Sequence, residues 1–303
     1  MGTKRRRMGA IFLLAVALIG GRLFLNHKKS TIRLARFHGH RIWDFIHSYV
    51  YLKWTSKYVG LVKYVLERPY ILPGQLYRRA GNRLMQTHHS KVITDDTAKR
   101  IIDINSPIEV RNSEQVLPFE KARDIILKNS DHIVVTDCAC RQVSENPCHP
   151  IDVCFYLGEP FADFLIEHKK HNARRVGVEE ALELLKQERD RGRVHTAWFK
   201  DALGNRLYAI CNCCSCCCMG FRALSHGFEI IASSGYIAWV DHDKCTLCGE
   251  CENVCHFGAI TVGDLVEINT EKCKGCGVCA TTCPTESISL QEDATKTKPL
   301  ILP

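Results

Sequence analysis

The sequence lacks the short motifs that mark common cofactor sites and catalytic triads. It contains no G-x-G-x-x-G run, no Walker loop and no flavin fingerprint. No serine, histidine and aspartate stand in an arrangement that indicates nucleophilic catalysis. We therefore expect no nucleotide cofactor and assign no catalytic residue.

Acidic residues are scarce in the first part of the chain. Residues 1–91 carry 18 Lys and Arg against 2 Asp and Glu, a net charge of +16. Residues 92–303 carry 23 against 31, a net charge of −8. All 18 cysteines lie after residue 137. The chain of 303 residues is long enough for two modest domains, so a basic leader precedes an acidic, cysteine-rich body.

Long apolar runs are also missing. The longest, Met8–Ile19, has 12 residues and follows four basic residues. That length is typical of a signal-peptide core, whereas residues 8–25, with Arg22 reaching to the surface, make 18 positions and nearly suffice for one membrane helix. No small-x-small cleavage site follows. We therefore favour an uncleaved membrane anchor within residues 1–30, with a cleaved export signal, including a twin-arginine signal, as the alternative.

The positive charges around this run predict its orientation. Four basic residues precede it, and five follow within about 20 residues of its end. The small excess favours a membrane protein with a single N-terminal anchor and its body on the cytoplasmic side. Export of the body stays the alternative.

Residues 31–91 are basic, and apolar residues recur at helical spacing from Ile42 to Leu66. Aromatic residues are interleaved with the basic ones there. A helix on a membrane surface and a helix packed on the protein's own body both fit this pattern. We expect no nucleic-acid partner, because a nearby membrane anchor explains both features.

One cysteine pattern occurs twice near the C-terminus. The run C-x2-C-x2-C-x3-C is repeated after 28 residues, and its members are Cys245, Cys248, Cys251, Cys255 and Cys273, Cys276, Cys279, Cys283. Three thiolates spaced in this way on a tight loop can each reach a different iron of a cuboidal cluster. Zinc sites usually use two separated C-x2-C pairs, and a disulfide framework gives no reason for two matching registers.

Residues 236–290 therefore resemble a bacterial two-[4Fe–4S] ferredoxin domain. In that family the fourth cysteine of each run binds the cluster of the other run. The resemblance implies one cluster on Cys245, Cys248, Cys251 and Cys283, and a second on Cys273, Cys276, Cys279 and Cys255. The second run ends in the family's Cys-Pro, but the first ends in Cys255-His256. This departure keeps the ligand and changes the surroundings of its sulfur, which tune the potential.

Residues 121–232 predict a small α+β unit. Helices are expected over Lys121–Asn129, from Pro160 through His168 and over Val178–Asp190. A strand is expected over His132–Thr136, and a hairpin over His195–Phe199 and Arg206–Cys211.

Ten cysteines lie in this unit: Cys138, Cys140, Cys148, Cys154, Cys211, Cys213, Cys214, Cys216, Cys217 and Cys218. Six of them fall within eight residues, where free thiolates repel one another and free thiols oxidise. Bound metal removes both problems. Because two predicted strands each end in a cysteine group, we expect the groups to converge at one edge of a sheet.

The pattern C-x-C-R, C-x5-C and C-N-C-C-x-C-C-C resembles a module found beside ferredoxin domains in iron–sulfur proteins of anaerobic microbes, and this resemblance implies no reaction. Three interpretations stay open: an additional iron–sulfur cluster, zinc or another structural metal, and disulfides or unliganded thiols. His149 and His195 are candidate ligands.

The predicted fold class is α+β, with an N-terminal membrane helix, a small cysteine-rich unit and a C-terminal two-cluster ferredoxin-like domain. The expected domains are an anchor or signal (1–30), a basic helical region (31–91), a connector (92–120), the cysteine-rich unit (121–232), the ferredoxin-type domain (236–290) and a tail (291–303).

The predicted function is membrane-associated transfer of single electrons through two [4Fe–4S] clusters, with a further metal or cluster site and a redox partner protein. The alternative is an oxidoreductase whose cysteine-rich site reduces a bound substrate. A metal-handling or redox-sensing module is a third hypothesis.

Overall fold

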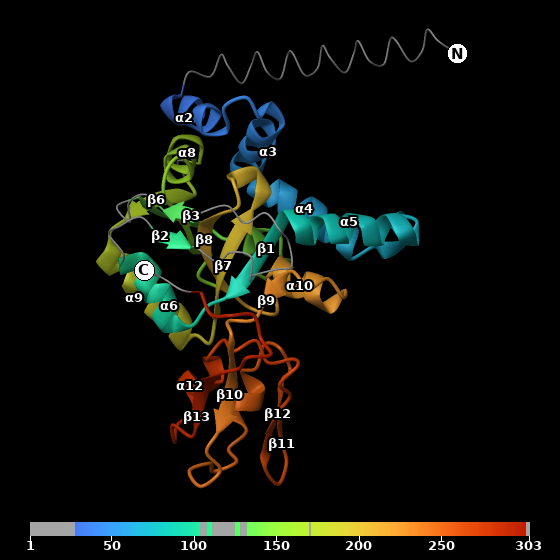
Figure 1. Cartoon of the computed structure of the whole chain (residues 1–303), viewed down its shortest axis with the longest axis vertical. Coiled ribbons are helices and arrows are strands. Elements are labelled where there is room, and N and C mark those ends of the chain that lie inside the picture. Colours follow the sequence, from blue (N-terminus) through green and yellow to red (C-terminus); the bar gives the residue numbers. More distant parts are fainter. Residues whose placement is uncertain (1–27, 104–107, 111–124, 128–131, 170, 301–303) are drawn as a thin grey trace.

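The computed structural model describes residues 28–103, 108–110, 125–127, 132–169 and 171–300, and it has a mixed α/β architecture (Figure 1). The first helices are α2 (Lys29–His38), α3 (Ile42–Lys53), α4 (Thr55–Leu66), the short 3-10 helix η1 (Pro69–Ile71) and α5 (Gly74–Thr87).

A seven-stranded sheet forms the centre of the molecule, in the order β6-β4-β5-β8-β7-β1-β9. All neighbouring strands are antiparallel except β1 and β9, which are parallel. Its strands are β1 (His88–Val92), β4 (Ile133–Asp137), β5 (Asp152–Leu157), β6 (Ala173–Val176), β7 (Val194–Lys200), β8 (Arg206–Cys213) and β9 (Ile231–Ala232). A separate antiparallel pair joins β2 (Ile108–Val110) and β3 (Ile125–Leu127).

Helices cover both faces of this sheet, because alternate strand residues are apolar on each side. On one face, Ile133 and Val135 of β4 pack with α6 (Asp95–Asp103) and α9 (Val178–Asp190). On the other face, Val134 lies in a core shared with α2, α3, α4, α8 (Phe161–His168) and α10 (Met219–Ser225). The short helix α7 (Ala139–Gln142) follows β4, and the 3-10 helix η3 (Asp201–Leu203) joins β7 to β8.

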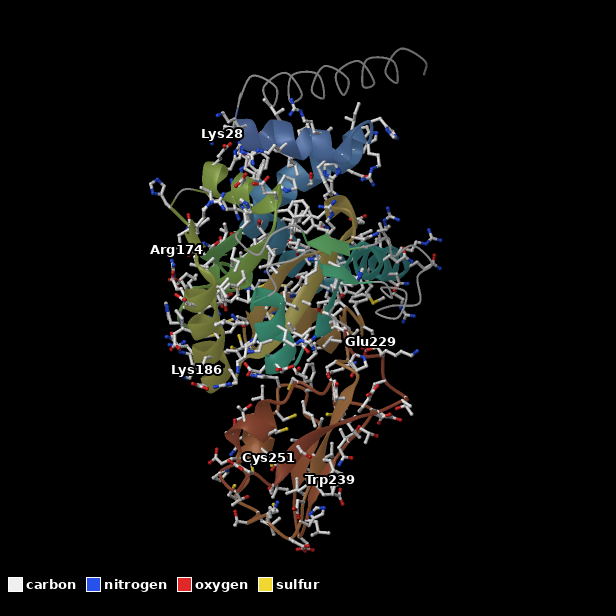
Figure 2. All side chains as sticks on the ribbon, turned by 60° about the vertical axis from the view of Figure 1, so that its left-hand side comes forward. Lys28, Arg174, Lys186, Glu229, Trp239 and Cys251 are labelled. Carbon is white, nitrogen blue, oxygen red and sulfur yellow. The ribbon has the colours of Figure 1, made fainter. Side chains whose placement is uncertain are left out.

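The C-terminal module has its own small core and lies at one end of the sheet (Figure 1). Figure 2 shows it with Trp239 and Cys251 labelled. It is built from two strand pairs and two short helices: β10 (Tyr236–Val240) with β13 (Ile288–Glu292), β11 (Ile260–Val262) with β12 (Val266–Ile268), α11 (Glu250–Asn253) and α12 (Val278–Thr282). Both helices follow a glycine with a left-handed backbone, Gly249 or Gly277.

The predicted fold class, α+β with an N-terminal membrane helix, is wrong, and so is the predicted membrane localisation: the described residues form a mixed α/β structure. Among the residues described, no helix is both long enough and apolar enough to cross a membrane. Residues 8–25, where the anchor was predicted, lie outside the described ranges. The apolar residues that follow are used elsewhere, since Tyr49, Leu52 and Leu66 of α3 and α4 are buried against the sheet.

The predicted helix over Lys121–Asn129 is also wrong where the structure describes it. Residues Ile125–Leu127 form strand β3, paired antiparallel with β2. The β-branched pair Ile125-Ile126 suits a pleated strand better than a helix. The rest of that segment lies outside the described residues.

Candidate metal centres

Two hollows in the C-terminal module divide the eight cysteines of the repeated runs. One hollow, of about 300 Å³, is lined by Cys245, Cys248, Cys251 and Cys283. The other, of about 350 Å³, is lined by Cys273, Cys276, Cys279 and Cys255. Each hollow thus receives three thiols from one run and the fourth from the other, which is the grouping that the resemblance implies.

The residues around these hollows suit thiolate ligands. The backbone N–H of Ala238 donates to Cys273 Sγ over 3.4 Å, and that of Ala259 donates to Cys255 Sγ over 3.3 Å. Burial opposes ionisation of Cys283, but hydrogen bonds from Ser287 and Thr285 lower its pKa to about 7. Burial raises the pKa of Cys276 to about 12, so that thiol needs a bound cation to ionise at neutral pH.

The strand order brings the cysteines of the middle unit to one end of the large sheet. Cys138 follows the last residue of β4, Cys154 lies near the start of the antiparallel β5, and Cys211 and Cys213 end β8. Cys154 stands directly opposite Cys211 in the register of β5 and β8. The structure therefore places the cysteines that follow β4 next to those that end β8, with Cys154 of β5 between them.

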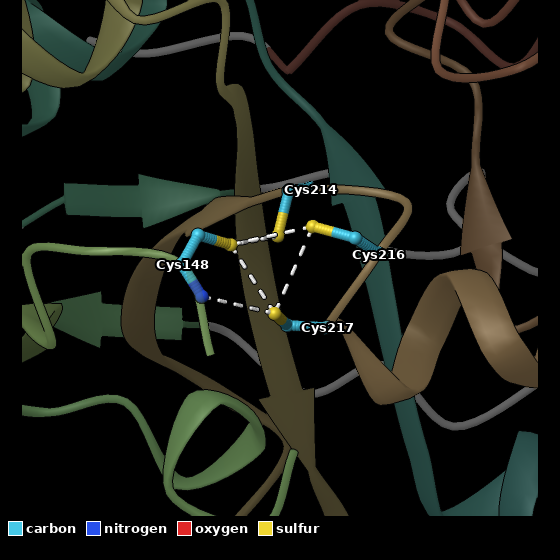
Figure 3. Close-up of side chains that lie close together, drawn as sticks. All are labelled: Cys148, Cys214, Cys216 and Cys217. Atoms are coloured by element: carbon cyan, nitrogen blue, oxygen red, sulfur yellow. Dashed lines mark hydrogen bonds between the residues drawn. The ribbon is translucent and has the colours of Figure 1, made fainter. Parts of the chain in front are cut away.

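Four of these thiols form a compact group around Cys148, which we call the four-thiol group (Figure 3). Cys148 Sγ lies 3.2 Å from Cys214 Sγ, 3.3 Å from Cys216 Sγ and 3.2 Å from Cys217 Sγ. All four sulfurs lie within 4.8 Å of one another.

This spacing fits a single tetrahedral ion. Bonds of about 2.3 Å from zinc to four sulfurs would separate the sulfurs by about 3.8 Å. Tetrahedral S₄ sites hold zinc or iron. The pKa of Cys217 is lowered to about 7 because, against the effect of burial, the backbone N–H of Cys148 donates to its sulfur over 3.5 Å. Burial raises the pKa of Cys148 to about 11, and a bound cation would offset this effect.

The other six thiols form a second set, the six-thiol wall: Cys138, Cys140, Cys154, Cys211, Cys213 and Cys218. Sulfur contacts connect them in the order Cys211, Cys154, Cys138, Cys140, Cys218 and Cys213. Contacts with Cys140 and Cys154 lower the pKa of Cys138, whereas the pKa values of those two partners are raised. The number and softness of these ligands fit an iron–sulfur cluster, which needs four of them.

Arg141 supplies a buried positive charge beside this wall. Its side chain is 1 % exposed, donates to Glu188 Oε2 over 3.0 Å and also donates to the carbonyl oxygens of Asn212 (3.1 Å) and Pro150. Burial opposes the shift, but Glu188 and the thiols Cys138 and Cys154 raise the pKa of Arg141. The guanidinium thus joins the cysteine-bearing elements and stabilises thiolate charge near them.

A cavity of about 920 Å³ opens against the six-thiol wall. It is also lined by Tyr51, Tyr58 and Val62 of α3 and α4, and by Tyr208 and Trp198 of the sheet. Helix α4 covers α7, since Lys63 Nζ donates to Val143 O over 3.0 Å and Ser56 donates to Gln142. The sequence predicted a helical pattern here but not that the helix encloses the thiols.

His256 links the C-terminal module to the four-thiol group. Its Nδ1 accepts hydrogen bonds from the backbone N–H (3.3 Å) and the hydroxyl (3.1 Å) of Ser215, which lies between Cys214 and Cys216. Its Nε2 donates to Gly192 O over 2.7 Å. Burial lowers the pKa of His256, which favours the neutral ring that the two bonds accepted by Nδ1 require. The residue that departs from Cys-Pro is therefore an inter-module contact.

Neither of the two candidate histidine ligands belongs to the four-thiol group. His195 is buried and bonds through Nδ1 to Asn212 Oδ1 over 2.6 Å, and His149 is exposed. The described residues contain no compact metal-ligand group that includes either one. Asn212 also donates to Val153 O over 2.8 Å, so His195 helps to position the strands that carry the cysteines.

Residues 244–287 match the family model of the 4Fe-4S dicluster domain. No curated protein matches the chain. The match includes all eight cysteines of the two runs, and it confirms a ferredoxin-like domain that follows a cysteine-rich region. From here on we call the C-terminal module the dicluster domain.

Proposed function

We propose that this chain is an iron–sulfur redox protein in which the dicluster domain exchanges single electrons with a metal centre in the thiol-rich end of the large sheet. The dicluster domain and the four-thiol group support iron–sulfur chemistry and metal binding. When bound, the clusters supply one-electron chemistry over a wide range of potentials. We assign the crossed ligand sets to the two hollows, a single ion to the four-thiol group and a cluster to the six-thiol wall.

The contact made by His256 is the observation that carries this proposal. His256 follows Cys255, which lines the hollow nearer to the sheet, and it bonds to Ser215 within the four-thiol group. Phe257 packs beside this contact against Phe221 of α10, at a ring-centroid distance of 4.8 Å. Cys214 and Cys217 belong to the four-thiol group and also line the cavity. A continuous set of bonded and packed residues therefore connects the dicluster domain to the six-thiol wall.

The first hollow offers a surface for a redox partner protein. Cys248 is exposed, and its neighbour Leu247 is 42 % exposed. We propose that the partner exchanges electrons with the dicluster domain at this loop.

The substitution His256→Pro tests the function, because proline already follows Cys283 in the second run. We expect both dicluster signals to persist in EPR spectra of anaerobically purified protein. After rapid partial reduction, electron exchange between the dicluster domain and the middle centre should slow, because all three hydrogen bonds of the imidazole are lost. Ser215→Ala removes one of these bonds from the other side and should slow exchange less.

Ser225→Ala is the matched control, since this exposed serine bonds only within α10. Iron and sulfide contents establish that each variant is fully loaded. Exchange rates that are unchanged in His256→Pro and Ser215→Ala would contradict the proposal, as would a middle unit that holds only zinc.

A second candidate function is reduction of a small molecule bound at the six-thiol wall. The observation that favours it is the cavity, which gives a bound molecule direct access to that wall.

A further inference from the structure

We propose that the cavity binds a small, uncharged, ring-shaped molecule that is mostly apolar and carries one hydroxyl or carbonyl oxygen. The role of such binding rests on the proposed function, because the bound molecule would be the substrate of the second candidate function. The binding itself stands on the volume of the cavity, its walls and one hydrogen-bond chain.

The two hollows of the dicluster domain give a scale for the volume of the cavity. Each is shaped for one cluster and measures about 300 or 350 Å³. The cavity measures about 920 Å³ by the same criterion. A cluster on the six-thiol wall would therefore take up little more than a third of it. The cavity is therefore larger than one cluster requires, and the remaining space beside the six-thiol wall is open to a small ligand.

The wall of the cavity outside the thiols is largely apolar and aromatic, and it includes Val59 and Val62 of α4, Tyr156, Trp198 and Met219. Lys169 also lines the cavity, and its Nζ donates to Thr55 Oγ1 over 3.0 Å. Trp198 uses its indole N–H on Thr196 Oγ1, over 2.9 Å, so its ring presents only apolar surface to the cavity. Flat aromatic faces at this wall favour a ring-shaped ligand, which can stack on them or meet them edge to face.

A chain of hydrogen bonds reaches the cavity through His88, Tyr208 and Tyr51. His88 Nε2 lies 2.9 Å from Tyr208 Oη, which lies 2.7 Å from Tyr51 Oη. All three residues line the cavity, and burial lowers the pKa of His88, so the imidazole is neutral. In the tautomer with a proton on Nε2, His88 donates to Tyr208 and Tyr208 donates to Tyr51. The hydroxyl proton of Tyr51 is then free to donate to a ligand oxygen, since buried tyrosine hydroxyls take a partner.

Binding of 2-naphthol and of naphthalene to the anaerobically purified, fully loaded chain tests this inference. The two probes share the ring system and differ in one hydroxyl. We expect saturable binding of 2-naphthol by isothermal titration calorimetry and a rise in melting temperature. Tyr51→Phe should weaken 2-naphthol binding by about 2- to 10-fold, the effect of one hydrogen bond, and should leave naphthalene binding unchanged.

Filling the cavity gives a test that does not depend on the hydrogen bond. Val62 lines the cavity, whereas its neighbour Leu61 on the same helix is 64 % exposed. Val62→Trp should abolish binding of both probes, and Leu61→Trp should leave both unchanged.

Two results would overturn the inference: no saturable binding of either probe, or probe binding that survives Val62→Trp. If the probes do not bind and the middle unit contains about eight irons, a larger cluster fills the cavity. Probe binding needs no electron transfer, so its failure is distinct from a failure of the electron exchange tested with His256→Pro.

Discussion

The dicluster domain and the thiol-rich end of the sheet both bring several cysteine side chains together, but the chain supplies those cysteines differently in the two regions. In the dicluster domain a repeated loop supplies three thiols to one hollow, and a single residue crosses to the other hollow. At the end of the large sheet, thiols from the strands β5 and β8, the helix α7 and the loops beside them meet. Neighbours in sequence separate there: Cys213 belongs to the six-thiol wall and Cys214 to the four-thiol group.

Strand geometry explains this separation. Successive residues of a strand point to opposite faces, so Cys211 and Cys213 at the end of β8 share a face. The chain then turns before α10, and Cys214, Cys216 and Cys217 lie against Cys148 instead. A run of adjacent cysteines can thus supply two sites, because the strand ends inside it.

The largest effect is expected from Cys154→Ser and Cys148→Ser, which test whether the ten thiols form two sites. Cys154→Ser should remove about four irons with matching sulfide from the middle unit and keep the single ion. Cys148→Ser should remove about one metal ion per chain and leave the cluster on the six-thiol wall. Metal and sulfide analysis of both variants measures the difference.

Cys216→Ser is a control for the second change, since Cys216 is the exposed member of the same group and should give the same loss. Loss of the same metal in Cys154→Ser and Cys148→Ser would show one shared site.

A smaller effect is expected from Arg141→Met, which breaks the buried ion pair with Glu188. Removal of one partner of a buried pair costs about 3–5 kcal/mol of unfolding free energy. We expect the lower end, because Glu188 keeps Arg191 at 2.8 Å. Arg174→Met, in the exposed pair with Glu180, should cost about 0–1 kcal/mol.

Urea unfolding under anaerobic conditions measures both values. EPR spectra should show unchanged dicluster signals in Arg141→Met, because the guanidinium contacts only the middle unit. Equal destabilisation by the two substitutions would contradict the role assigned to Arg141.

Elements with strong local signals were predictable from the sequence. The helix Val178–Asp190 and the hairpin of β7 and β8 occur where they were expected, because acidic residues, a following glycine and a turn mark their ends. The covering position of α4 was not predictable. Its apolar spacing indicates a buried face, but only the tertiary structure shows that this face, with Val59 and Val62, encloses thiols.

The candidate site was likewise predictable only in part. The grouping of the eight repeated cysteines could be predicted, because their spacing resembles that of a known family. For the ten middle cysteines the sequence predicted only that they bind metal. Which of them lie together could not be predicted, because it depends on strand order and on the turn after Cys213. Arg141 and His256 lie within the cysteine motifs. Their roles could not be predicted, because their partners Glu188 and Ser215 lie 47 and 41 residues away.

The smallest effect concerns a difference between the two repeated loops. Leu247 and Gly275 occupy equivalent positions, and both have a left-handed backbone, with φ of 55° and 65°. A side chain at Gly275 would place its Cβ 2.1 Å from Tyr236 O, which explains the glycine there. Leu247 meets no such constraint because it is 42 % exposed, but its backbone still carries the strain of a left-handed leucine.

We therefore expect Leu247→Gly to raise the unfolding free energy slightly. Relief of the left-handed conformation contributes about 1–2 kcal/mol, and the greater freedom of glycine in the unfolded chain offsets about 0.5–1 kcal/mol. The net gain of about 0.5–1 kcal/mol should appear as a higher midpoint of urea unfolding. Thr246→Gly, one residue earlier and without a positive φ, should lower the midpoint instead. If Leu247→Gly destabilises the protein as much as Thr246→Gly does, the leucine side chain contributes contacts that outweigh its backbone strain, and the two loops differ in more than the space around one Cβ.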